Sequence, residues 1–97
     1  MTGNSGNGKK RRKIEFKLEA PEAREVYLAG AFNDWSLKKH PMKKNGDGSW
    51  KKALMLPAGV YEYKFCVDGR WQEDPNNLRR CMNRFGSINS IVHIHIR

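Results

Sequence analysis

The sequence lacks the disulfide frameworks, long apolar runs and signal peptides that are typical of secreted and membrane proteins. Its 97 residues include only two cysteines, Cys66 and Cys81, which are too few for a disulfide framework and match no zinc-binding spacing. No apolar run approaches the roughly 20 residues of a transmembrane helix, and the polar residues 1–8 contain no hydrophobic signal-peptide segment. We therefore expect a cytoplasmic protein with no membrane contact and two free thiols. A Cys66–Cys81 disulfide would be reasonable only after export.

The sequence also lacks a convincing set of catalytic residues. It contains no Ser/His/Asp or Cys/His arrangement typical of nucleophilic catalysis. His93 and His95 alternate along a strand, which is more typical of a solvated face than of a metal site. Asp68 and Asp74 could imitate a glycosidase pair, but Asp-Gly and Asp-Pro steps are better explained as turns. We expect a protein that is not an enzyme and uses no cofactor or metal.

Positive charge is abundant but unevenly placed. The formal net charge is +9, and residues 9–13 supply five positive charges in one run. The remaining 14 basic residues face ten acidic ones, so the rest of the chain is only mildly basic. Blocks of like charge usually form solvated tails. We predict a disordered basic leader over residues 1–13 and a folded domain over residues 14–97. Because the folded part is only mildly basic, we do not expect nucleic acid as a partner.

The folded part has the alternating pattern of β-strands. Ile14, Phe16 and Leu18 alternate with charged residues, and Tyr61, Tyr63, Phe65 and Val67 share one face of the clearest strand. Turn sequences separate the strands, and no segment of ten or more residues has a helical period. The pattern predicts an all-β sandwich or barrel with strands over residues 14–18, 26–30, 50–56, 60–67 and 91–96.

The three tryptophans divide into two groups. Trp50 opens a strand and alternates with apolar residues, so we expect it to be structural. Trp35 and Trp71 follow turn-like segments rich in polar residues, where large exposed aromatics point to a ligand. An indole can cover the C–H face of a pyranose ring, while groups such as Lys64 and Asn89 bond the hydroxyl rim. Burial of both indoles in the core is the competing interpretation.

Long segments of the chain resemble carbohydrate-binding module family 48, which includes glycogen-binding domains. Residues 26–35, VYLAGAFNDW, are similar to the family's V-x-x-x-G-x-F-N-x-W opening. Residues 56–71, LPAGVYEYKFCVDGRW, are similar to its central L-P-x-G-x-Y-x-Y-K-F-x-V-D-G-x-W segment. Asp74-Pro75 and residues 85–92 resemble its closing run. The resemblance implies an immunoglobulin-like, early-set β-sandwich that binds α-glucan without catalysis.

The resemblance also implies which residues contact the sugar. Two tryptophans, a lysine and an asparagine match positions that contact glucan in glycogen-binding members. In the closing loop, Phe85 matches an apolar residue that inserts against the sugar ring, and Ser87 matches a hydroxyl residue. The implied carbohydrate-binding set is Trp35, Lys64, Trp71, Phe85, Ser87 and Asn89.

The implied partner is an α-glucan polysaccharide or a malto-oligosaccharide, and a glycogen-metabolising enzyme is a further candidate. The alternative function is a module that docks or regulates such an enzyme, or a kinase, without binding sugar itself. Arg79, Arg80 and Arg84 make the segment before the closing loop unusually basic. These arginines either border the sugar site or serve another partner.

Overall fold

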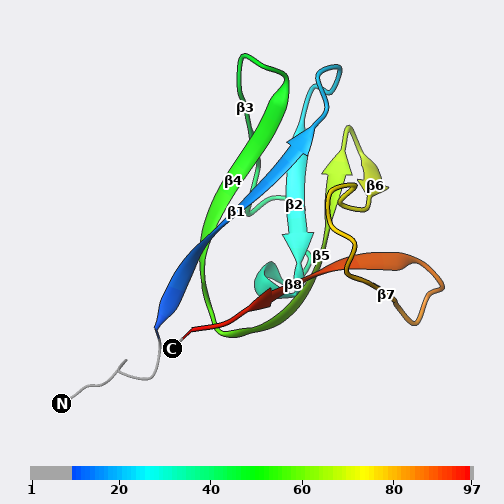
Figure 1. Cartoon of the computed structure of the whole chain (residues 1–97). Helices are drawn as coiled ribbons and strands as arrows, with labels where there is room; N and C mark the ends of the chain where they lie inside the picture. The colour runs from blue at the N-terminus through cyan, green and yellow to red at the C-terminus, as the bar shows by residue number, and fades with distance from the viewer. Residues whose placement is uncertain (1–9, 97) are drawn as a thin grey trace.

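The computed structural model describes residues 10–96, which form two antiparallel β-sheets (Figure 1). The fold is all-β, as predicted, and the short 3-10 turn η2 is the only helical element among the described residues. No helix in this part of the chain is long and apolar enough to cross a membrane. The elements are β1 (Arg11–Glu19), β2 (Val26–Gly30), η2 (Ala31–Asn33), β3 (Lys43–Lys44), β4 (Ser49–Pro57), β5 (Gly59–Val67), β6 (Arg70–Gln72), β7 (Arg80–Met82) and β8 (Ile88–Ile94).

The strands divide into a smaller and a larger sheet. The smaller sheet has the order β1-β4-β3, and the larger has the order β2-β5-β8-β7 with β6 also paired to β5. A single bend residue, Ala58, separates β4 from β5 and carries the chain from the smaller sheet to the larger one. In Figure 1 the β7–β8 hairpin extends to one side of the molecule, away from the smaller sheet.

The core lies between the sheets and follows from the alternation in the sequence. Phe16 and Leu18 of β1 and Leu28 and Phe65 of the larger sheet are almost fully buried. The rings of Phe16 and Tyr63 meet edge to face across the core, with their centroids 5.0 Å apart. Because Tyr63 and Phe65 of β5 point into the core, the residues that alternate with them, Glu62, Lys64 and Cys66, point to the outer face of the larger sheet.

Trp50 is a core residue, which confirms its structural interpretation. Only 5% of its surface is exposed, and its Nε1 donates a 2.9 Å hydrogen bond to the carbonyl of Ala20. The indole therefore has both apolar packing and a partner for its single polar group.

The first strand begins earlier than the sequence predicted. Arg11, Arg12 and Lys13 pair with the last three residues of β4, so the predicted leader is too long at its C-terminal end. All three side chains are exposed, so their charges stay in water. The backbone can therefore continue the strand, because β4 supplies hydrogen-bond partners for it. Residues 1–9 of the predicted leader lie outside the described part of the chain.

Both cysteines are free, and the strand order separates them. Cys66 lies on β5 and Cys81 on β7, with β8 between these strands. Two strand spacings amount to roughly 10 Å, beyond the Cα separation of about 7 Å that a disulfide can span. The fold therefore excludes the Cys66–Cys81 bridge that the sequence left open.

Candidate functional site

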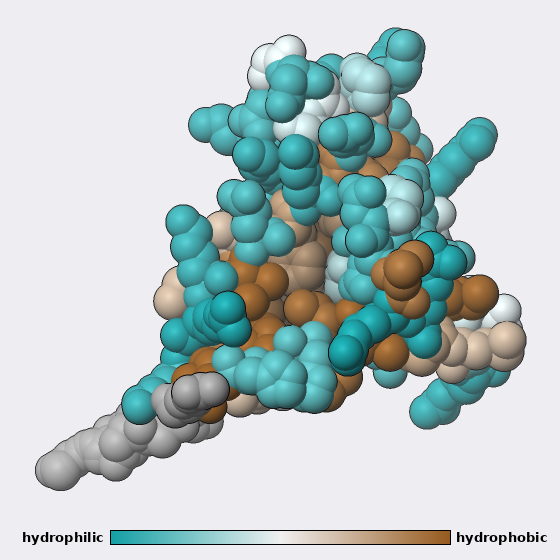
Figure 2. All heavy atoms as spheres, viewed as in Figure 1, coloured by the Kyte–Doolittle hydropathy of each residue, from teal (hydrophilic) through white to brown (hydrophobic). Residues whose placement is uncertain are grey.

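The outer face of the larger sheet contains an open hollow of about 690 Å³. Period-two alternation brings Glu62 and Lys64 of β5 to this face, beside Asn89 of β8. On the face of the molecule shown in Figure 2, hydrophilic side chains predominate and leave several exposed hydrophobic groups between them. The hollow is lined by Ala31, Trp35, Glu62, Lys64, Trp71, Met82, Asn83, Arg84, Phe85, Ser87 and Asn89. All six residues of the predicted set are therefore brought together.

A tight turn after β2 places Trp35 beside the hollow. Asp34 and Trp35 both have positive φ angles, 55° and 59°, which reverse the chain after η2. The amide of Trp35 donates to the Gly30 carbonyl at 2.9 Å. The buried Asn33 side chain holds the same turn from inside, accepting from the Gly30 amide and donating to the Leu28 carbonyl. Hydrogen bonds within this turn therefore fix the backbone position from which Trp35 projects.

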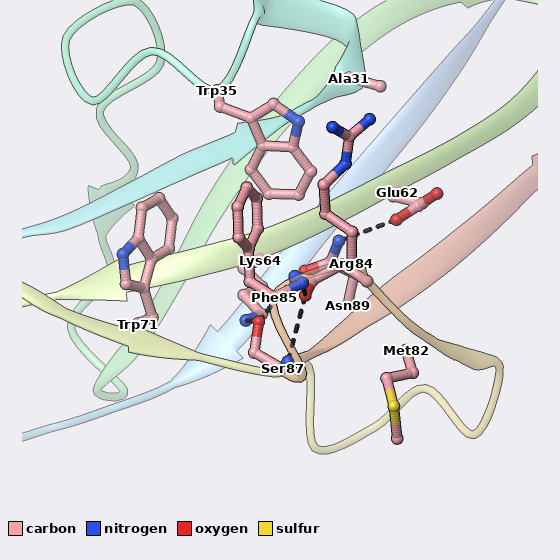
Figure 3. Close-up of a pocket in the computed structure, with 11 residues that line it drawn as sticks. Ala31, Trp35, Glu62, Lys64, Trp71, Met82, Arg84, Phe85, Ser87 and Asn89 are labelled. Carbon is pink, nitrogen blue, oxygen red and sulfur yellow. Dashed lines mark hydrogen bonds between the residues drawn. The ribbon is translucent and has the colours of Figure 1, made fainter.

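Trp71, which the sequence placed only after a turn-like segment, reaches the hollow from a strand. It lies in the middle of β6, opposite Cys66 of β5. The Asp68-Gly69 turn, with both φ angles positive, is short enough for the chain to pair again at once. Half of the Trp71 surface is exposed, and its ring centroid lies 6.3 Å from that of Trp35, with the planes at 74°. The two indoles thus form one angled aromatic surface, as drawn in Figure 3.

Polar groups lie beside the two indoles on the floor of the hollow. Lys64 is 9% exposed and donates one hydrogen bond to Ser87 Oγ at 3.1 Å. Asn89 is 4% exposed and donates to a carboxylate oxygen of Glu62 at 2.8 Å. These bonds leave further Lys64 and Asn89 hydrogen-bonding groups without a partner among residues 10–96.

Glu62 is a member of the site that the sequence analysis did not select. Hydrogen bonds from the Asn89 amide and the Cys81 thiol stabilise its charged form and lower the pKa of its carboxyl group. Burial, and then the bond to Glu62, raise the pKa of the Cys81 thiol. Glu62 is therefore a fixed carboxylate that orients Asn89. Glu62 alternates with Lys64 on the same face of β5, and this spacing could have identified it as a site residue from the sequence.

The β7–β8 loop closes one side of the hollow. Phe85 at its tip is 85% exposed, and in Figure 3 its ring points toward the two indoles. Arg84 also lines the hollow, whereas Arg79 and Arg80 do not. Arg80 instead forms a 3.3 Å ion pair with Glu73. Of the three arginines singled out in the sequence, one therefore borders the site.

The structure offers no support for a hydrolytic pair or a metal centre. The Asp68 carboxylate is exposed and accepts hydrogen bonds from the amides of Arg24 and Glu25, so it links the β5–β6 turn to the segment before β2. Asp74 is buried and accepts from the Tyr63 hydroxyl at 2.7 Å. Across residues 10–96 there is no group of three or more His, Cys, Asp or Glu side chains placed to hold a metal ion.

Comparison with known families identifies the kind of domain. The family model described as the glycogen recognition site of AMP-activated protein kinase matches residues 12–97. The chain belongs to this glycogen recognition family. Members are carbohydrate-binding modules, a non-catalytic type of domain, and the resemblance seen in the sequence is confirmed.

Relatives and solved structures agree with this assignment. The glycogen recognition domain is 38% identical over 71 residues to the β-2 subunit of 5'-AMP-activated protein kinase from Mus musculus and to that from Homo sapiens. In each case the match covers 73% of this chain but only 25% of the relative. A maltogenic amylase from S. marinus superposes with a TM-score of 0.76 at 23% identity, over 90% of this chain and 14% of the amylase. The last comparison supports the immunoglobulin-like sandwich fold.

Proposed function

We propose that the hollow on the larger sheet binds α-1,4-linked glucan of the glycogen or starch type, with Trp35 and Trp71 as its platform. The observation that carries this proposal is the angled pair of indoles beside the polar floor. Each indole can cover the C–H face of one glucose unit. Lys64, Ser87 and Asn89 are then placed to bond hydroxyl groups, and Phe85 packs against a sugar ring.

The angle between the indoles favours a curved ligand. Planes inclined at 74° cannot both stack on one flat run of sugars. An α-1,4-linked chain curves, so successive glucose units present their faces in different directions. A β-1,4-linked chain is extended and nearly flat. The geometry therefore supports malto-oligosaccharide over cello-oligosaccharide.

Tryptophan fluorescence or calorimetry with maltoheptaose and cellohexaose tests this function. We expect weak binding of maltoheptaose, because an open hollow leaves much of the ligand in water, and tighter retention on polymeric glucan through repeated contacts. Trp35→Ala and Trp71→Ala should each weaken maltoheptaose binding by about 30-fold, as for a central aromatic contact worth about 2 kcal/mol.

The matched control is Leu78→Ala, which removes an apolar side chain that is 89% exposed and does not line the hollow. It should bind maltoheptaose like the wild type. Retention of full affinity by both tryptophan variants would exclude this site. Co-purification of a stable protein partner without any glucan binding would instead favour the docking function.

The proposal for the whole protein is broader than for the domain. The chain spans about a quarter of the length of the kinase subunits it matches. We place the folded carbohydrate-binding domain from about residue 11 onward, in a cytoplasmic protein without enzymatic activity of its own. A glycogen-metabolising enzyme or kinase complex is its proposed protein partner, supported by the names of the related subunits.

A further inference from the structure

The loop between β7 and β8 is organised by one side chain, Asn83. Its Oδ1 accepts hydrogen bonds from the amides of Phe85 at 2.9 Å and Ser87 at 3.1 Å. Its Nδ2 donates to Ser87 Oγ at 2.6 Å. Only an oxygen can accept from two N–H groups, so these contacts fix which end of the amide is which.

The orientation of Asn83 has a consequence for Ser87. A hydroxyl group has two acceptor lone pairs and one proton to donate. The Ser87 oxygen accepts from Asn83 Nδ2 and from Lys64 Nζ, and neither of these nitrogens can accept a hydrogen bond. Both lone pairs of Ser87 are therefore occupied, which leaves only its proton for a further partner.

That proton has no acceptor within residues 10–96. Ser87 lines the hollow and is exposed, so its remaining group faces the space where the proposed ligand lies. A serine is ordinarily free to donate or accept according to its partner. Because Lys64 and Asn83 occupy both acceptor positions, Ser87 can only donate.

We propose that Asn83 is a positioning residue that makes Ser87 an obligatory hydrogen-bond donor to an oxygen atom of the bound glucan. This inference rests on the proposed glucan-binding function and specifies its chemistry. Lys64 and Ser87 then both present donors at this part of the hollow. The sugar atom that they meet must act as an acceptor. This part of the site therefore selects a sugar oxygen that accepts hydrogen bonds at this position.

The variant Asn83→Asp tests the proposal because it keeps the shape of the side chain and replaces the donor end by an acceptor, while adding one negative charge. One oxygen of the introduced carboxylate can still accept from the Phe85 and Ser87 amides, so the loop is retained. The other oxygen replaces the Nδ2 donor and accepts a hydrogen bond from the Ser87 hydroxyl, which then cannot donate to the sugar. We expect maltoheptaose affinity to fall by about tenfold, the loss of one net hydrogen bond.

A double-mutant cycle separates this mechanism from a general effect of charge or folding. Ser87→Ala should also lose about tenfold, and adding Asn83→Asp to it should cause no further loss, because the proton is already gone. Ser87→Thr keeps the hydroxyl and should restore near wild-type binding. Unfolding temperature and the amide NMR spectrum of Asn83→Asp should match the wild type outside residues 83–89.

Each outcome decides the question. Wild-type affinity of Asn83→Asp, or an equal loss caused by it in the Ser87→Ala background, overturns the role of Asn83 while leaving glucan binding intact. Failure of the wild type to bind maltoheptaose overturns the glucan-binding function and this inference with it. Trp71→Ala, measured in the same series, confirms that the bound ligand occupies the hollow.

Discussion

Asn33 Nδ2 and His40 Nδ1 lie 2.7 Å apart at the base of the turn that carries Trp35. The other hydrogen of the Asn33 amide goes to the Leu28 carbonyl, and its oxygen accepts from the Gly30 amide. Asn33 is therefore the donor to His40, and His40 Nδ1 must be unprotonated to accept. The charge state of one histidine is thus linked to the segment that positions an indole of the site.

This link predicts that mild acid destabilises the domain. Burial first, and then the nearby positive charges of Lys52 and Lys39, lower the pKa of His40 from its ordinary value of 6.5. The unfolded chain consequently binds more protons than the folded one just below pH 6.5. The free energy of unfolding should fall as the pH drops below about 6.5, and this contribution should level off once the pH is below the pKa of folded His40.

Urea unfolding at several pH values between 7 and 5 measures this effect. The control is His40→Asn, whose side-chain oxygen can take the place of Nδ1 as the acceptor but does not titrate. Its stability should depend less on pH in this window. Identical slopes for the two proteins would show that His40 is not responsible.

Gly30 should tolerate no side chain. A Cβ atom there would lie 2.5 Å from the Glu62 carbonyl oxygen and 2.8 Å from the Tyr63 Cβ, although the backbone is extended and unstrained. Gly30→Ala should reduce the free energy of unfolding by about 1–3 kcal/mol through this overpacking. Thermal unfolding measures the loss. Gly46→Ala, where a Cβ has no neighbour within 4 Å, is the control and should change stability little.

The Tyr63 hydroxyl should stabilise the connection that leads to β7. It donates to Asp74 and accepts from Asn77 at 2.9 Å within the core. Tyr63→Phe removes both bonds from buried or half-buried groups and should cost about 1–3 kcal/mol. Tyr61→Phe, which loses a single bond to the Pro57 carbonyl, is the matched control and should cost less. Equal losses in chemical denaturation would contradict this account.

A row of three lysines crosses the smaller sheet, and charge reversal at its centre should stabilise the fold. Lys51 lies directly opposite Lys17 on one side and Lys43 on the other. Like charges opposite each other on adjacent strands are unfavourable. Lys51→Glu should raise the free energy of unfolding by about 0.5–1 kcal/mol at low salt. The gain should shrink at high salt, where Lys51→Gln, which only removes the charge, should approach the same stability.

The sequence alone specified most of the fold and the members of the predicted site. Alternation along residues 60–67 shows which side chains enter the core, because a strand can bury only one face here. Turn residues such as Asp68-Gly69 mark where the chain reverses. The short strands β3, β6 and β7 were not predicted, because a segment of two or three residues shows no clear period and pairs only where a longer strand lies beside it.

Other features of the site were decided by tertiary structure. Glu62 became part of the hollow because β8 brings Asn89 to its carboxylate. Asn83 gained its role because a five-residue loop folds back onto its amide, which no spacing in the sequence reveals.

The two indoles show the same division between sequence and structure. The motifs around Trp35 and Trp71 identified them as a pair, since that information is local and ordered along the chain. Their 74° angle and 6.3 Å separation follow from a left-handed turn and a short strand meeting on one sheet face, which is a property of packing. The sequence by itself determined the six residues of the predicted set, and the tertiary structure decided how they face the hollow and which further residues line it, because ring angle and side-chain contacts depend on how separate strands and loops pack.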